Sequence, residues 1–257
     1  MALVEDLVQD RIGYVTLNRP EKRNALGPEM VAGLVRAFEK LLADDAVKVI
    51  ILRANGDAFC AGADLAYLQE MQHYSYEENL SDSTRLKDLF LQIYLSKKVV
   101  IAQVQGAALA GGCGLITVCD FVFAVPEAKF GYTEVKIGFV PAIVMVFLIR
   151  KIGEARARQL LLTGDLIPAE AAVTSGLVTR VVARDQLESE VTEFARQLIA
   201  TASAQSLAMT KRMMAEVQQL PLEEALVFAC QQNAHARRTD DCKKGIDGFL
   251  RKQGITW

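Results

Sequence analysis

The stretch VVIAQVQGAALAGGCGLITVCDFVFAV, residues 99–125, contains the pattern that decides the fold class. It opens with a short apolar run, 99–104, that suits a strand buried on both faces of a sheet. A turn of small residues and glycines follows at 106–114, and then an apolar helical segment runs into Val118. A second strand is predicted at 121–125. Strands and helices that alternate and are joined by short turns predict an α/β fold.

The same alternation extends toward the N-terminus, whereas helical patterns dominate beyond residue 140. Strands are predicted at 12–18 and 48–53, and helices at 28–42 and 85–97. The polar stretch at 71–79 is interpreted as a mobile flap over the site. The helical patterns beyond residue 140 cover 143–163, 168–175, 186–200, 204–217 and 221–238. We expect a core with the candidate site over 1–197 and a helical region over 198–257 that packs on the core or on a neighbouring subunit.

Composition excludes several classes of protein. The 257 residues carry 29 Lys and Arg against 31 Asp and Glu, which lacks the basic field expected of a general nucleic-acid binder. The five cysteines form no CxxC pair and only two histidines occur, so we expect no metal site. No run approaches the ~18 apolar residues of a membrane span, and the N-terminus lacks the composition of a targeting signal. A cytoplasmic protein is therefore expected.

Two segments share a layout that suits ligand binding. In DAFCAGADL (57–65) and QGAALAGGCGL (105–115), a small-residue turn links a buried strand to the start of a helix. Small side chains let a ligand approach the backbone, and free N–H groups at a helix start can bind an oxyanion or a phosphate. Because the Walker and GxGxxG patterns do not fit, a backbone oxyanion hole is the better functional interpretation. For either segment alone, an ordinary tight turn remains the alternative.

A third segment, AKFGYTEVKIGFVPA (128–142), places Glu134 among apolar and small residues. Partial desolvation would raise the pKa of such a carboxyl and suit it to proton transfer. The alternative is a surface glutamate at the start of a helix capped by Thr133, and the residues alone do not choose between the two.

Together these segments resemble the crotonase, or enoyl-CoA hydratase/isomerase, superfamily over nearly the whole chain. The matching stretches are GYVTLNRPEKRNAL (13–26), DAFCAGADL (57–65), GAALAGGCGLITVCD (106–120), FGYTEVKIGFVP (130–141), LLTGDLIPAEAAVTSGLV (161–178) and a C-terminal segment ending at FLRKQ (249–253). The resemblance implies a crotonase-type spiral of ββα units with a C-terminal helical oligomerisation region, assembled as trimers that often pair into hexamers. It also implies an acyl-CoA thioester as substrate, so coenzyme A belongs to the substrate and no separate cofactor is expected.

The resemblance also assigns site residues. It gives the oxyanion hole to the backbone N–H groups of Ala63 and Gly111, and acid/base catalysis to Glu134. Residues that match the family's coenzyme A and acyl contacts are Arg23, Ala25, Ala61, Asp64, Leu65, Gly112, Gly138, Pro141, Phe249 and Lys252. The last two match a pair that often reaches the coenzyme A of a neighbouring subunit. Tyr67 and Tyr132 are further candidates, since either hydroxyl could hold a water, although packing is the more common role of such a tyrosine.

One position departs from the family pattern. Hydratases of this family typically carry a second glutamate where this chain has Gly114. Two carboxylates can hold a water and deliver it to a double bond, whereas one is enough for a 1,3-proton shift. Because residues 130–142 resemble single-glutamate, methylglutaconyl-CoA hydratase-like members, we expect hydration or dehydration of a short or branched 2-enoyl-CoA. The alternatives are a Δ3-Δ2 enoyl-CoA isomerase that uses Glu134 alone and a non-catalytic oligomer that binds acyl-CoA or RNA.

Overall fold

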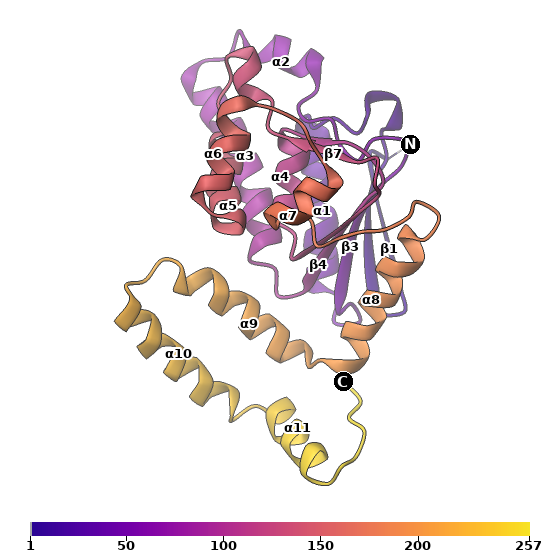
Figure 1. The fold of residues 1–257 in the computed structure, drawn as a ribbon, viewed down its shortest axis with the longest axis vertical. Coiled ribbons are helices and arrows are strands. Elements are labelled where there is room, and N and C mark those ends of the chain that lie inside the picture. The colour runs from indigo at the N-terminus through magenta and orange to yellow at the C-terminus, as the bar shows by residue number, and fades with distance from the viewer. Residues whose placement is uncertain (1) are drawn as a thin grey trace.

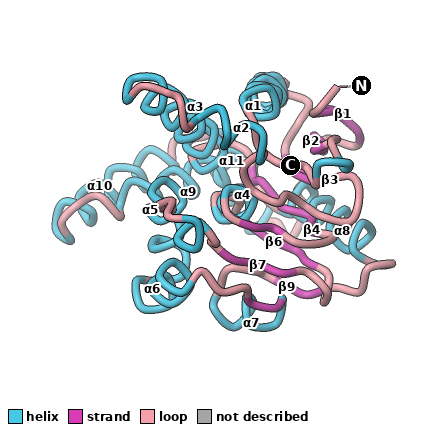
Figure 2. Tube along the Cα trace, turned by 90° about the horizontal axis from the view of Figure 1, so that it is seen from above, coloured by secondary structure: helices cyan, strands magenta, loops and turns pink. Residues whose placement is uncertain are grey.

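The computed structural model describes residues 2–257, and a six-stranded sheet lies at its centre. Its strands, in their order across the sheet, are β1 (Val4–Gln9), β2 (Ile12–Leu17), β3 (Val49–Ala54), β4 (Val99–Val104), β6 (Phe121–Ala124) and β9 (Arg180–Val181). The β1–β2 pair is antiparallel and every pair from β2 to β9 is parallel. Figure 2 shows the strands following one another from β1, beside the N-terminus, to β9. This arrangement confirms the predicted α/β class.

A second, smaller sheet is built from short strands. β5 (Ala108–Leu109), β7 (Lys129–Gly131) and β8 (Ile167–Pro168) pair in the order β5-β7-β8. Two isolated bridges, Leu26 with Ala63 and Cys60 with Ala108, extend this row on the β5 side. Successive turns of the chain therefore contribute a long strand, a short strand or bridge, and a helix, which confirms the predicted spiral of ββα units.

Helices cover the main sheet on both faces. They are α1 (Pro28–Ala43), α2 (Leu65–Met71), α3 (Tyr76–Tyr94), α4 (Gly111–Thr117), α5 (Ala142–Ile152), α6 (Glu154–Thr163), α7 (Ala169–Ser175), α8 (Leu187–Thr201), α9 (Ala204–Val217), α10 (Leu222–Ala236) and α11 (Asp240–Leu250). Every residue of β2 and the first four of β3 and of β4 are buried, as a doubly covered parallel sheet requires. α1 packs on β1 and β2, while α8 packs across β3, β4 and β6. Within residues 2–257 no helix is both long and apolar enough to cross a membrane.

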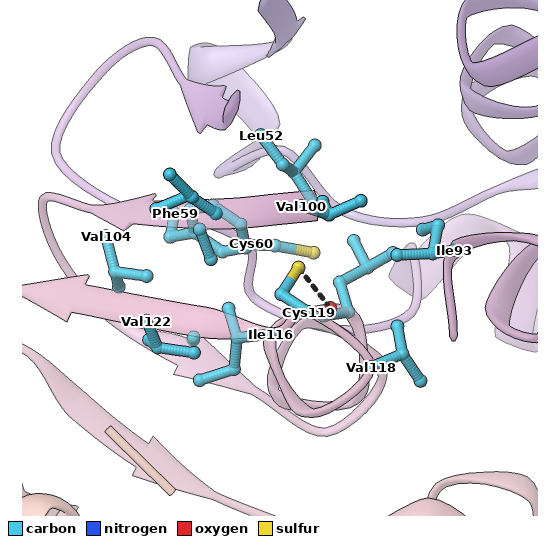
Figure 3. Close-up of a cluster of buried hydrophobic side chains, with 14 of the residues drawn as sticks. Leu52, Phe59, Cys60, Ile93, Val100, Val104, Ile116, Val118, Cys119 and Val122 are labelled. Atoms are coloured by element: carbon cyan, nitrogen blue, oxygen red, sulfur yellow. Dashed lines mark hydrogen bonds between the residues drawn. The ribbon is translucent and has the colours of Figure 1, made fainter. Parts of the chain in front are cut away.

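Helix α4 runs through the middle of the apolar core. All of its residues after Gly111 are buried, and Figure 3 shows Ile116 among side chains of β4 and β6. Such close packing needs the glycines of this helix, since a Cβ built on Gly112 would lie 2.3 Å from the carbonyl oxygen of Cys60. The small residues of the 106–114 turn are therefore fixed by packing as well as by any contact with a ligand.

The structure corrects one predicted helix and defines the stretch interpreted as a flap. The single helix expected at 143–163 is two helices, because Gly153, with a φ of 79°, turns the chain between α5 and α6. Much of the stretch at 71–79 is helical, and its role as a mobile flap stays a prediction. There Ser75 and Glu78 form a capping box that starts α3, with the Ser75 N–H 2.8 Å from the Glu78 carboxylate.

The chain turns away from the sheet at the end of α8, and the predicted boundary at 197 lies inside this helix. In Figure 1, α9, α10 and α11 lie at the opposite end of the molecule from α2. α10 packs on α9, and each of its residues stays at least partly exposed. Its exposed apolar side chains are those of Leu222, Leu226 and Val227. The C-terminal helices thus present an apolar surface beyond the core.

A buried ion pair joins α9 to the core. Lys211 Nζ lies 2.7 Å from Asp120 Oδ2, and the Lys211 side chain is 7% exposed. The same ammonium group donates to the carbonyls of Ile93 and Lys98, each at 3.2 Å. The Asp120 carboxylate also accepts the N–H of Val100 at 2.7 Å. One lysine therefore holds α9 against the end of α3 and the start of β4.

We expect Lys211→Ala to lower the free energy of unfolding by about 2–4 kcal/mol, because a largely buried carboxylate and two carbonyl groups lose their partner. Urea denaturation of both proteins at the same concentration measures the change. Lys243→Ala is the control, since the Lys243–Asp240 pair is exposed and should contribute less than about 1 kcal/mol. Equal effects of the two substitutions would contradict a stabilising role for the buried pair.

Candidate active site

Residues 60–64, which follow β3, lie between two other extended segments. On one side they pair with the segment around Leu26. The Leu26 N–H donates to the Gly62 carbonyl at 2.7 Å, and the Asp64 N–H donates to the Leu26 carbonyl at 2.9 Å. Alternate N–H groups of an extended segment point to opposite sides. The N–H of Ala63 therefore points away from Leu26.

On the other side, the same segment pairs with the residues that lead into α4. The Cys60 N–H donates to the Ala107 carbonyl at 3.1 Å, and the Leu109 N–H donates to the Cys60 carbonyl at 2.9 Å. This pairing ends at Ala110, whose φ of 47° and ψ of −122° turn the chain into the helix. Because the two segments separate there, the N–H groups just beyond the split lose their main-chain partners.

The two predicted donors lie at this split. In the part of the chain that the structure describes, the N–H groups of Ala63 and Gly111 donate to no other protein group. A Cβ built on Gly62, the residue before Ala63, would lie 3.8 Å from the Gly111 nitrogen, so the two loops are in contact. Gly111 is the first residue of α4, where an N–H has no acceptor within the helix. Two neighbouring free N–H groups can bind the oxygen of a carbonyl group.

Glu134 lies at the start of the 3₁₀ turn Glu134–Ile137, just after β7. The Ala110 N–H donates to the Gly131 carbonyl at 2.8 Å, which joins this segment to the residue before Gly111. Burial raises the pKa of the Glu134 carboxyl. Its Oε2 atom is buried and, among the described residues, has no hydrogen-bond partner. A carboxyl with these properties can exchange a proton with a ligand held nearby.

The alternative interpretation of Glu134 does not match the structure. The Thr133 side chain makes no capping hydrogen bond to the turn that follows it within residues 2–257. The glutamate is half-buried, whereas a surface glutamate would be exposed. The apolar and small residues around Glu134 in the sequence therefore indicate a partly buried carboxyl and not a surface one.

Gly114, the position of the absent second glutamate, is enclosed by apolar side chains. A Cβ built on Gly114 would lie 2.5 Å from Val144 Cγ1 and 2.8 Å and 2.9 Å from two carbons of the Phe90 ring. Phe90 and Val144 therefore fill the space that a larger side chain would need. The site has no room for a second carboxylate from this position.

The two candidate tyrosines differ in their surroundings. Tyr132 is fully buried and its hydroxyl lies 2.6 Å from Thr117 Oγ1, so it packs the segment after β7 against α4. Its hydroxyl is enclosed by protein, which favours the packing alternative, and a role for Tyr132 in holding a water stays a prediction. Tyr67 is half-buried in α2, and its hydroxyl donates to Asp82 Oδ1 at 2.5 Å. Because its proton is engaged there, Tyr67 can offer a water only an acceptor oxygen.

Asp64 caps the helix that follows Ala63. Its carboxylate accepts the N–H of Ala66 at 2.9 Å and lies 2.7 Å from the Arg19 guanidinium. Burial alone would raise the pKa of this carboxyl, but the backbone hydrogen bonds and Arg19 outweigh burial and hold the pKa below its ordinary value. The ionised side chain thus fixes the start of α2 next to the proposed donor.

Asn24 is a buried part of this framework that the sequence analysis did not identify. Its Nδ2 donates to the carbonyls of Asn55 and Ala58, at 2.8 Å and 3.0 Å, and its Oδ1 accepts the Arg19 N–H at 2.8 Å. A φ of 54° places Asn24 in the left-handed region, which asparagine tolerates better than most residues. An asparagine in the turn after Pro20 was the available signal.

Most of the other predicted contacts lie around the same split. The Ala61 N–H donates to the Arg23 carbonyl at 3.0 Å, and Ala25 is buried two residues further on. Leu65, at the start of α2, is 79% exposed. Gly112 lies buried behind Gly111. Gly138 ends the 3₁₀ turn that begins at Glu134, and Pro141 precedes α5.

Phe249 and Lys252 lie apart from these residues. They line a cavity of about 510 Å³ together with Trp257, at the end of α11. Arg11, just before β2, donates to the Trp257 carbonyl at 2.7 Å, so this cavity lies near the end of the sheet where β2 begins. Ala63 and Gly111 instead follow the ends of β3 and β4. Contact between Phe249 or Lys252 and the site of a neighbouring subunit stays a prediction.

Comparison with known proteins identifies the family. Residues 8–257 match the model of the family described as enoyl-CoA hydratase/isomerase. The chain is 42% identical over 242 residues to the "Putative enoyl-CoA hydratase" of Thermus thermophilus, with 94% of this chain and 95% of the relative covered. It is 37% identical over 251 residues to the "Probable enoyl-CoA hydratase" of Rhizobium meliloti, with 95% and 93% covered.

Solved structures agree with this result. The crystal structure of an enoyl-CoA hydratase of Mycobacterium smegmatis has a TM-score of 0.92 to this chain at 33% identity, with 99% of this chain and 98% of that one covered. The free N–H groups and the enclosed carboxyl lie in segments that the match spans. The chain therefore belongs to the enoyl-CoA hydratase/isomerase family, the crotonases.

Proposed function

We propose that the protein adds water across the double bond of a 2-enoyl-CoA, or catalyses the reverse dehydration. The observation that carries this proposal is the Glu134 carboxyl, which has a raised pKa and a buried oxygen without a hydrogen-bond partner among residues 2–257. Relatives named enoyl-CoA hydratase, at 42% and 37% identity over most of the chain, support hydration as the reaction. They favour it over the isomerase alternative, which would need the same carboxyl but no water.

In the proposed mechanism, the thioester carbonyl oxygen accepts hydrogen bonds from the N–H groups of Ala63 and Gly111. Polarisation of this carbonyl withdraws electrons from the double bond, so the oxygen of a water can add to Cβ. The resulting enolate oxygen is held by the same two donors, and each is worth roughly 3–4 kcal/mol in the transition state. Because the donors belong to the backbone, they need no reorganisation as the charge develops.

Glu134 acts as the general base and then as the general acid of this reaction. As a carboxylate it takes a proton from the attacking water, and as a carboxylic acid it then gives a proton to Cα. One carboxyl can serve both steps, since the first step leaves it in the state that the second requires. Phe90 and Val144 occupy the space at Gly114, so a second carboxylate does not take part from there. Tyr67 remains a candidate hydrogen-bond acceptor for the other O–H of the water, which stays intact and becomes the hydroxyl group of the product.

For the substrate we propose a short or branched, apolar acyl group. Exposed apolar side chains follow Glu134 closely in the chain, with Ile137 at 70% and Val140 at 66% exposure. They offer an apolar surface for an acyl chain. Coenzyme A enters and leaves as part of the substrate, so the proposal includes no separate cofactor.

We further propose a homo-oligomer, trimer or hexamer, in the cytoplasm. The exposed apolar side chains of α10 support assembly, because an exposed patch of neighbouring apolar side chains commonly marks a protein–protein interface. Assembly would also allow Phe249 and Lys252 to meet coenzyme A on a neighbouring subunit. The five free thiols suit a reducing compartment.

A product assay in ¹⁸O-labelled water tests the reaction. We expect a short 2-enoyl-CoA or 3-methylglutaconyl-CoA to give a 3-hydroxyacyl-CoA that carries the label, because the added hydroxyl comes from solvent. Mass spectrometry of the acyl product measures the label, and a reaction in unlabelled water is the control. The proposal of a hydratase would give way to that of an isomerase if a 3-enoyl-CoA became a 2-enoyl-CoA without label and neither 2-enoyl substrate were hydrated.

Glu134→Gln should lower kcat by about 10²-fold or more, since an amide cannot exchange the proton. In the wild type, kcat/KM should fall as the pH is lowered through a value above 4.5, because burial raises the Glu134 pKa and only the carboxylate accepts a proton from water. Steady-state kinetics between pH 4 and pH 9 measure both. Glu127→Gln is the matched control, because Glu127 is exposed in a surface pair with Arg184.

The stability of Glu134→Gln separates loss of chemistry from loss of folding. The wild-type carboxyl has a higher pKa folded than unfolded, so it binds more protons in the folded state and stability is lost as pH rises through that range. The amide lacks this dependence. The variant should therefore be at least as stable as the wild type at pH 7, and the difference should shrink below pH 4.5. Near-normal turnover of this folded variant would remove Glu134 from the mechanism.

Gly114→Glu should destabilise the protein by about 1–3 kcal/mol, because its Cβ would meet Val144 and Phe90 at 2.5 Å to 2.9 Å. Urea denaturation and turnover of the single variant measure this effect. The double variant Gly114→Glu/Phe90→Ala should lose less stability than the sum of the two single variants, since the smaller side chain at 90 leaves space for the glutamate. A single variant as stable as the wild type would show that the second carboxylate is absent for a reason other than space.

A further inference from the structure

Ala110 has a strained backbone at the point where the two loops separate. Its φ of 47° and ψ of −122° lie in a region that glycine adopts freely and that residues with a side chain rarely adopt. Arg23, by comparison, has a positive φ of 50° but a ψ of 35°, within the ordinary left-handed region. Strain of this kind persists only where the surrounding structure enforces it, and it concentrates at functional sites.

Hydrogen bonds on both sides of Ala110 enforce this conformation. Its N–H donates to the Gly131 carbonyl at 2.8 Å, and its carbonyl accepts the Gly114 N–H at 2.9 Å. The first bond ties Ala110 to the segment that leads to Glu134, and the second belongs to α4. The backbone between these fixed groups must turn sharply. The turn leaves the Gly111 N–H at the N-terminal end of α4, beside the loop that contains Gly62 and Ala63.

The methyl group of Ala110 contacts the loop that carries the first donor. A Cβ built on Gly62 would lie 2.9 Å from the Ala110 Cβ, so this methyl group occupies the space above Gly62. Gly62 is buried with a φ of 91°, and its peptide bond to Ala63 contains the first donor N–H. The Ala110 methyl group therefore lies between the loop of one donor and the loop of the other, as a spacer.

We propose that Ala110 is a positioning residue of the oxyanion hole, in which the strained backbone and the methyl group against Gly62 set the separation of the Ala63 and Gly111 N–H groups. The inference rests on the proposed function, because this separation matters only when both groups bind a thioester oxygen. Glycine would take the same backbone without strain. Alanine is thus not required for folding at this position, and what it adds is a fixed spacing.

The test is Ala110→Gly, measured by a probe that does not depend on turnover. 4-(Dimethylamino)cinnamoyl-CoA is a chromophoric 2-enoyl thioester whose absorption moves to longer wavelength when its carbonyl is polarised. We expect a red shift on binding to the wild type and a smaller one on binding to Ala110→Gly. For a short 2-enoyl-CoA, kcat should fall about tenfold to 10²-fold, because the donors lose their alignment. The Tm should stay equal or rise, since the substitution relieves strain.

Two further variants make the test specific. Ala110→Ser keeps a Cβ against Gly62 and should retain the wild-type red shift and kcat. Asp10→Gly removes the side chain at another residue of positive φ, 53°, in the β1–β2 turn at the far end of the sheet, and should leave both readouts unchanged. An unchanged red shift and kcat in Ala110→Gly would overturn the positioning role, and so would a Tm that falls together with kcat. A wild type that binds the probe without a red shift would overturn the proposed oxyanion hole and this inference with it, a result distinct from failure of Ala110→Gly alone.

Discussion

The candidate active site depends on main-chain hydrogen bonds that hold residues 60–64 between two other segments. Three backbones can approach this closely only where side chains are minimal. A Cβ on Gly106 would lie 1.9 Å from the Asp57 carbonyl oxygen, and one on Gly112 would lie 2.3 Å from that of Cys60. The same small residues that permit this packing leave N–H groups accessible beyond the split. One set of small residues therefore allows the close packing of the backbone and leaves room for a ligand.

Several unfavourable features meet at this place. Within residues 2–257, two N–H groups and a buried carboxyl oxygen of Glu134 have no protein partner, and the backbone of Ala110 is strained. Each costs folding free energy, and such costs persist where surrounding structure supports them. Helix α4 receives that support at its other end, where Lys151 donates to the carbonyls of Ile116, Thr117 and Cys119. The C-terminus of the helix is thereby satisfied, while its N-terminus stays free to meet a negative charge.

The sequence predicted the elements with a clear apolar period, such as α1 and the buried strands β2, β3 and β4. It did not predict the second sheet, because strands as short as Ala108–Leu109 have no period to detect. Family resemblance pointed to Ala63, Gly111 and Glu134, but their surroundings depend on contacts between distant segments. The burial of Tyr132 against Thr117 and the enclosure of Gly114 by Phe90 are examples that no local pattern contains.

The enclosure of Gly114 bears on how one carboxyl can suffice. In a site with two close carboxylates, each charge disfavours the other and raises a pKa. Here the raised pKa of Glu134 comes from burial, the largest cause, without a second acid. Burial alone thus raises the pKa of Glu134, which suits this carboxyl to the proton transfer that we propose for it. What the second carboxylate would add is an orientation for the water, and in the mechanism we propose that task would fall to Glu134 itself or to the acceptor oxygen of Tyr67.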